Sequence, residues 1–159
     1  MDAVKAEGDK LNTETSESNN VIHCELKPEM SKDYFRFSDK ITFEDIRILQ
    51  EHFVEERNWN QYHVPRNLLL ALVGEVGELA ELFQWRGEVK EGLPDWTENE
   101  KEHLAQELSD VLLYLLRLSE KCRIDLPAAV LDKIGLNAKK YPVTKVWGSN
   151  KKYTEYKES

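Results

Sequence analysis

Four stretches of the chain repeat apolar residues at the spacing of an amphipathic helix, and capping or helix-breaking residues separate them. In the first stretch, Thr42 and Asp45 have the spacing of a capping box. The predicted helices span residues 42–57, 67–85, 97–122 and 125–141. With only seven Gly and five Pro, the composition does not suit a turn-rich β architecture. We therefore expect an all-α fold, a four-helix bundle.

The two ends of the chain lack this periodicity. Residues 1–39 are rich in Ser, Thr, Asn, Glu and Lys, a composition typical of a disordered tail. Residues 143–159 are polar and Lys-rich, and we expect an extended tail there. One helical domain, residues 40–142, remains between them, which is a length that can bury a single core.

The net charge of −8 argues against partners that are themselves polyanions, namely nucleic acid polymers and anionic membranes. No apolar run approaches the roughly 18 residues of a membrane span, and acidic residues near the start do not suit a targeting peptide. Cys24 and Cys122 lack the spacing of a zinc site. These features predict a cytoplasmic protein in which a phosphate-rich substrate would need a cation as mediator.

Carboxylates lie on faces of two predicted helices that should be buried. On a helical wheel of residues 67–85, Glu75 falls inside the apolar arc and Glu78 lies at its margin. Glu107 and Asp110 stand in the same relation to the apolar stripe of the third helix. Residues three apart have Cβ atoms about 5–6 Å from each other. Antiparallel packing of the two helices would bring the two acidic pairs face to face.

Four carboxylates that meet in this way would repel by roughly 4 kcal/mol per close pair at an effective dielectric constant near 20. A divalent cation would remove this repulsion. Oxygen ligands favour Mg²⁺, with Mn²⁺ as a possible substitute, over zinc. Because Mg²⁺ commonly binds carboxylates together with substrate phosphates, a nucleotide is the natural second ligand.

Three other interpretations of the acids are open. They form ordinary solvated helix faces, or they belong to a noncatalytic helical interaction module with a basic partner. The third is a dimetal-carboxylate oxidase, for which Glu100 and His103 supply one Glu-x-x-His motif. The second copy of that motif is missing from the sequence, and Glu100 already completes a capping box with Thr97.

The run Gly-Glu-Val-Gly-Glu-Leu-Ala-Glu-Leu from Gly74 and the run Glu-Leu-Ser-Asp-Val-Leu from Glu107 resemble the ExxE and ExxD motifs of MazG-like nucleoside triphosphate pyrophosphohydrolases. The resemblance extends over roughly residues 42–156. It implies a homotetramer of four-helix subunits that cleaves a deoxynucleoside triphosphate to its monophosphate and pyrophosphate. Its expected substrates are dCTP and 5-modified dCTP analogues, so that the enzyme would clean the nucleotide pool.

The resemblance also implies roles for individual residues. The magnesium ligands would be Glu75, Glu78, Glu107 and Asp110, and either Glu75 or Glu78 would be the catalytic base. The nucleotide pocket would be lined by Gln50, Trp59, Asn60, Gln61, Tyr62, His63, Trp85 and Tyr114. The helical wheel places Trp85 beside Glu78. Gln50 departs from several relatives, which have His there, and its amide can form hydrogen bonds but cannot carry charge.

Overall fold

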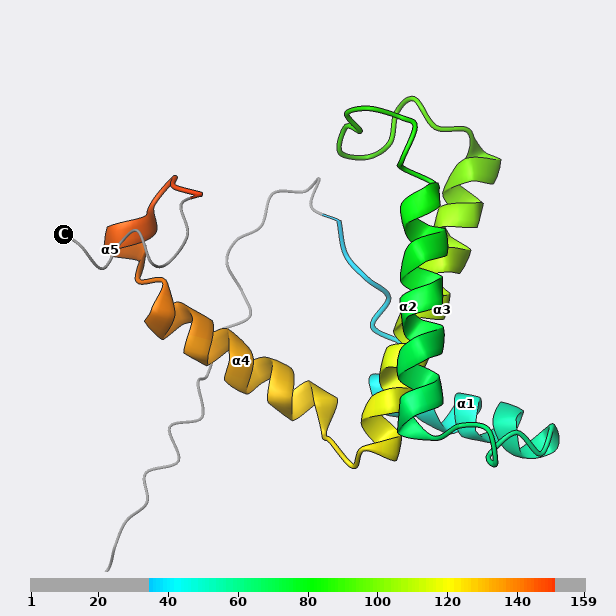
Figure 1. Ribbon diagram of the computed structural model, residues 1–159. Coiled ribbons are helices and arrows are strands. Elements are labelled where there is room, and N and C mark those ends of the chain that lie inside the picture. The colour runs from blue at the N-terminus through cyan, green and yellow to red at the C-terminus, as the bar shows by residue number, and fades with distance from the viewer. Residues whose placement is uncertain (1–34, 151–159) are drawn as a thin grey trace, which may run out of the picture. The chain divides into compact units, whose positions relative to one another are not determined.

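The computed structural model describes residues 35–150, and this part of the chain contains five α-helices and no strand (Figure 1). The helices are α1 (Phe43–Glu56), α2 (Pro65–Glu81), α3 (Glu98–Lys121), α4 (Leu126–Lys140) and α5 (Val143–Val146). The prediction of an all-α fold with four main helices is confirmed. Most of the predicted N-terminal tail, residues 1–34, lies outside the described residues, as does 151–159. None of the described helices is long and apolar enough to cross a membrane.

Side chains fix the starts of three helices as the sequence predicts. Thr42 Oγ1 accepts from the Asp45 backbone N–H at 3.1 Å, and Asp45 Oδ2 accepts from the Thr42 backbone N–H at 2.8 Å. Thr97 and Glu100 repeat this capping box at the start of α3. At α4, Asp125 Oδ1 accepts from the Ala128 backbone N–H at 3.1 Å. Each bond satisfies a backbone donor that the first helical turn leaves free.

The boundaries of α2 differ from the predicted range of 67–85. The helix begins at Pro65, whose fixed φ suits the first helical position and whose missing N–H is not needed there. It ends at Glu81, and turns follow. Trp85 therefore lies beyond the helix and is 88% exposed. The helical-wheel placement of Trp85 beside Glu78 was wrong, because it assumed a helix that has already ended.

α2 and α3 run antiparallel and side by side, and α1 packs against α3 (Figure 1). The segment that joins α2 to α3 folds back through Trp96, which is 7% exposed. Trp96 packs against Phe83, with ring centroids 5.2 Å apart, and Arg86 lies 4.1 Å from its ring centre on the face. The apolar residues that this arrangement buries are Val54, Leu68, Trp96, Leu104 and Leu116.

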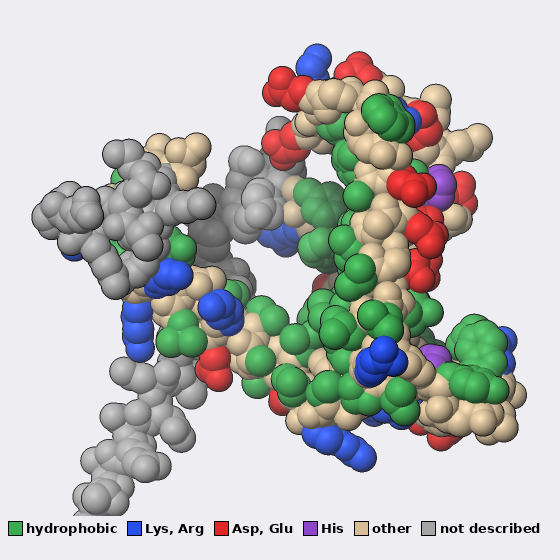
Figure 2. All heavy atoms as spheres, in the orientation of Figure 1, with side chains coloured by type: hydrophobic (Ala, Val, Ile, Leu, Met, Phe, Trp, Pro, Cys, Tyr) green, Lys and Arg blue, Asp and Glu red, His purple; other side chains and the backbone are tan. Residues whose placement is uncertain are grey.

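Several apolar helix faces stay uncovered within the described chain. Val130 and Ile134 on α4 are 45% and 59% exposed, although the apolar spacing of the fourth predicted helix indicates that they point inward. Leu49 and Phe53 on α1 are also exposed, and Figure 2 shows hydrophobic side chains at the surface of α2 and α4. Periodicity identifies an apolar face but not the element that covers it. The predicted extended tail also begins differently, because Val143–Val146 form α5.

The buried charge of the described core is Arg117 on α3, whose side chain is fully inaccessible to solvent. Its Nη1 donates to the carboxylates of Glu51 on α1 and Glu120 on α3. Nη2 donates to Asn60 Oδ1 at 2.7 Å, and Nε donates to His63 Nδ1 at 3.2 Å. One guanidinium thus connects α1, α3 and the loop between α1 and α2.

Removal of this guanidinium should destabilise the fold, since Glu51 and Glu120 would lose their buried partner. We expect Arg117→Met to lower the free energy of unfolding by about 3 kcal/mol, the lower part of the range for breaking a buried ion pair, because both carboxylates are partly exposed. Urea denaturation measures this loss. Arg47→Met is the matched control, since Arg47 also pairs with Glu120 but is 34% exposed, and its loss should be much smaller. Equal losses in the two variants would contradict the central role of Arg117.

The cap of α3 gives the protein a specific acid sensitivity. Hydrogen bonds from the Thr97 backbone, Arg86 and the Thr97 hydroxyl lower the pKa of Glu100 from 4.5 to about 2. Because the pKa is lower in the folded state, the stabilisation is present above about pH 4.5 and is lost as the pH falls towards 2. Glu100→Gln keeps a cap-forming side chain without the charge. We expect the stability difference between wild type and Glu100→Gln to shrink across this pH range.

Chemical denaturation at successive pH values measures this difference. Glu98→Gln serves as the control for surface charge, because Glu98 lies in the same helical turn and its exposed carboxylate accepts from Lys101. A difference between wild type and Glu100→Gln that stays constant with pH would contradict the proposed origin of the acid sensitivity.

Candidate metal and nucleotide site

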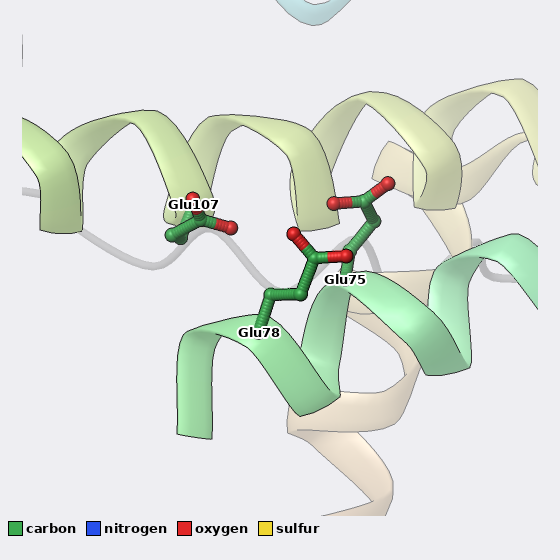
Figure 3. A group of neighbouring side chains, drawn as sticks. All are labelled: Glu75, Glu78 and Glu107. Atoms are coloured by element: carbon green, nitrogen blue, oxygen red, sulfur yellow. The ribbon is translucent and has the colours of Figure 1, made fainter. Parts of the chain in front are cut away.

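Three carboxylates meet where α2 faces α3. Glu75 and Glu78 project from α2 and Glu107 projects from α3, and all three point into the space between the helices (Figure 3). One carboxylate oxygen from each lies within 4.8 Å of the others. Residues three apart share one helix face, and the antiparallel partner brings the third acid to that face. The arrangement offers a set of oxygen ligands from two rigid elements.

Asp110 lies outside this group of three, but its charge affects the pKa of Glu75. Burial raises the pKa of Glu75, and the charges of Asp110, Glu78 and Glu107 raise it further. The pKa of the Tyr114 hydroxyl is also raised, first by burial and then by Glu75 and Asp110. The structure therefore gathers all four predicted acids and Tyr114 into one region of negative potential.

The environment of Glu107 fits a bound cation. Its side chain is 13% exposed, and its Oε1 lies 3.1 Å from His103 Nε2. Its Oε2 is buried and has no hydrogen-bond donor within residues 35–150. A buried polar atom without a partner costs about 1–3 kcal/mol, and more when it is charged. A hard divalent cation such as Mg²⁺ or Mn²⁺ matches the all-oxygen donor set and would satisfy this atom.

Four of the predicted nucleotide contacts lie in the loop between α1 and α2 and fall into two groups. Asn60 and His63 bind Arg117, so they already hold structural partners. Burial and the charge of Arg117 lower the pKa of His63, which leaves its ring neutral at pH 7 with Nδ1 as an acceptor. Trp59 and Tyr62, from the same loop, are 43% and 60% exposed. Their side chains are the ones that remain open to a ligand.

Gln50 and Gln61 have different surroundings. Gln61 Nε2 donates to the Asn58 carbonyl at 3.1 Å within the loop. Gln50 Nε2 donates to the carbonyl of Leu113, next to Tyr114, at 3.0 Å. Gln50 Oε1 is buried and lacks a donor among the described residues. Gln50 thus links α1 to α3 and presents an unused hydrogen-bond acceptor.

A cavity of about 370 Å³ lies where the end of α2, the start of α3 and the segment between them meet. It includes Trp85 from the predicted set, together with Arg86, Trp96 and His103, which the sequence did not identify as pocket residues. His103 joins this cavity to the carboxylates through its contact with Glu107. A larger cavity of about 410 Å³, next to Arg47 and Ile124, contains none of the predicted site residues.

The position of Glu100 removes the basis for the oxidase interpretation. Its carboxylate accepts from Thr97 at the cap and from Arg86. Glu100 therefore does not join His103 as a ligand pair, and the one Glu-x-x-His motif serves to start the helix.

Residues 71–156, which contain all four acids, match the MazG-like family. The chain belongs to the MazG-like family. Members of this family are metal-dependent and hydrolyse nucleoside triphosphates to monophosphate and pyrophosphate. The resemblance predicted from the ExxE and ExxD motifs is thereby confirmed.

Two similar proteins are the human and mouse enzymes named dCTP pyrophosphatase 1. Each is 54% identical over 121 residues, which cover 76% of this chain and 71% of the relative. A crystal structure of a pyrophosphatase from Archaeoglobus fulgidus resembles this fold with a TM-score of 0.58 and 33% sequence identity. That match covers 68% of this chain and 99% of the archaeal chain.

The acidic group of this MazG-like chain should lower the stability of the metal-free protein and should bind a divalent cation. Without a divalent cation, Glu75→Gln removes like-charge repulsion, about 1 kcal/mol for a solvated pair, and should raise Tm by about 2–4 °C. Excess Mg²⁺ should raise the Tm of the wild type, since it binds the folded state, and should have little effect on Glu75→Gln. Differential scanning fluorimetry with EDTA or Mg²⁺ measures both effects.

Glu81→Gln is the matched control, because Glu81 is exposed on the same helix, one turn from Glu78. It should keep the Mg²⁺ response of the wild type. If neither Mg²⁺ nor Mn²⁺ changes the Tm of the wild type, the acidic group is not a metal site.

Proposed function

We propose that this chain hydrolyses dCTP and 5-modified dCTP analogues to the corresponding monophosphate and pyrophosphate, with Mg²⁺ as cofactor and Mn²⁺ as a substitute. The observation that carries the proposal is the group of Glu75, Glu78 and Glu107, with one buried oxygen left unsatisfied. It occurs in a MazG-like chain that is 54% identical to human dCTP pyrophosphatase 1. The activity would remove unwanted nucleotides from the pool.

In this proposal Glu75, Glu78, Glu107 and Asp110 would hold the metal, and its positive charge would offset the negative charge of the substrate phosphates. The attacking water loses its proton to Glu75 or Glu78. Both lie on the face of α2 that looks towards α3, and Glu75 is the more buried of the two.

Other members of the predicted set would contact the nucleoside directly. An exposed indole can stack on a base, a contact worth about 1–3 kcal/mol, and Trp59 and Trp85 offer one at each end of α2. The free Oε1 of Gln50 can accept from the amino group that cytosine carries and thymine lacks. This chemistry supports dCTP over dTTP as substrate. Tyr114 completes the contact between acids and nucleoside, while Asn60, Gln61 and His63 shape the loop.

We also propose a homotetramer in the cytosol. The support for assembly is the exposed apolar surface of α2 and α4, which a second copy of the chain would cover. The large apolar side chains on these helices that are at least half exposed are Leu69, Leu70, Val73, Leu131, Ile134 and Leu136.

Turnover of dCTP tests the proposal directly. Purified protein with Mg²⁺ should convert dCTP to dCMP and pyrophosphate, which chromatography separates. Glu78→Gln should lower kcat by at least about 100-fold, since it removes both a ligand and a proton acceptor. Glu81→Gln should retain wild-type turnover. If the wild type cleaves no triphosphate in a panel of dNTPs with either Mg²⁺ or Mn²⁺, the proposal is wrong.

A further inference from the structure

His103 makes a contact that neither the motifs nor the family assign. It lies one helical turn before Glu107 on α3, and its Nε2 is 3.1 Å from Glu107 Oε1. The His103 side chain is 56% exposed, whereas that of Glu107 is 13% exposed. An accessible imidazole thus covers one oxygen of a buried carboxylate.

The chemistry of the two groups sets the direction of this hydrogen bond. An ionised carboxylate only accepts, so the imidazole Nε2 carries the hydrogen and donates it. The neutral tautomer with hydrogen on Nε2 is sufficient, and the contact requires no charge on His103.

The two oxygens of Glu107 therefore have different surroundings. Oε1 has His103 as its donor, and Oε2 is buried without a donor in the described chain. Glu107 also contributes a ligand atom within 4.8 Å of Glu75 and Glu78. With Oε1 engaged by His103, Oε2 is the oxygen left free for a cation.

We propose that His103 is a positioning residue for the metal site, which holds Glu107 so that Oε2 is presented to the cation. The inference rests on the proposed function, because it takes Glu107 to be a metal ligand. A flexible glutamate that is already oriented loses less freedom when the metal binds, so the site is preorganised.

The contact between His103 and Glu107 should contribute little to folding stability as a surface ion pair. Exposed pairs four residues apart on a helix add little to folding stability, so His103 should matter little for the fold. Hydrogen bonds to metal-binding side chains act differently, since their loss typically lowers metal affinity by 10- to 100-fold. The two roles therefore predict different measurements.

The experiment is Mn²⁺ binding to the full-length protein, followed by the loss of the free-ion signal in electron paramagnetic resonance. His103→Leu keeps the bulk of the side chain and removes the donor, and it should weaken Mn²⁺ binding by about 10- to 100-fold at an unchanged metal-free Tm. His103→Gln restores an N–H donor and should bind within a few-fold of the wild type. His52→Leu, an exposed histidine on α1, is the matched control and should bind like the wild type.

The outcomes separate this inference from the proposed function. If the wild type binds no Mn²⁺, the metal site itself is wrong and the inference fails with it. If the wild type binds and His103→Leu binds equally well, the acidic site stands and the positioning role is overturned. Equal weakening in His103→Leu and His103→Gln would overturn it too, because the donor would then be irrelevant.

Discussion

Like-charge repulsion across the contact between α2 and α3 is the constraint on which the site depends. The same packing that buries Leu68 and Leu104 also brings Glu75 and Glu78 towards Glu107. The apolar contacts must be strong enough to hold the acids together. Burial, and then the charges of the neighbouring acids, raise the pKa of Glu75. Because Glu107 Oε2 has no hydrogen-bond partner among the described residues, this group of acids is suited to accept a cation from solution.

Arg117, on the same helix, is a charged residue that stabilises the fold. Its guanidinium is fully buried, yet each of its three nitrogens has an acceptor, from Glu51, Glu120, Asn60 or His63. Asp110 lies seven residues earlier on α3. It places a second negative charge near Glu75 instead of a neutralising positive charge. The charge of Arg117 is compensated by its partners, and this part of α3 stabilises the fold. The charges of the acids around Glu75 are not compensated, and we infer that this part of α3 binds a cation. Removal of a single charge should therefore destabilise the first group and relieve repulsion in the second.

The sequence predicts features that depend on local chemistry. The capping boxes at Thr42 and Thr97 are confirmed because each needs only residues three positions apart. The meeting of the acidic pairs follows from helix periodicity plus one antiparallel contact. Trp85 was misplaced because the end of α2 at Glu81 carries no Gly or Pro, so periodicity ran on past it. The exposure of Ile134 could not be predicted, since a helix face does not reveal its partner.

The loop between α1 and α2 shows how one segment serves both structure and recognition. Asn60 and His63 turn to Arg117, a contact that requires the distant helix α3 and that no local pattern could reveal. Trp59 and Tyr62 keep much of their surface exposed. Because a fixed backbone lowers the entropy lost on binding, anchoring the first pair prepares the second for a ligand. The residues that family resemblance assigns to the nucleotide are thus divided by the structure into those that hold the loop and those that it presents.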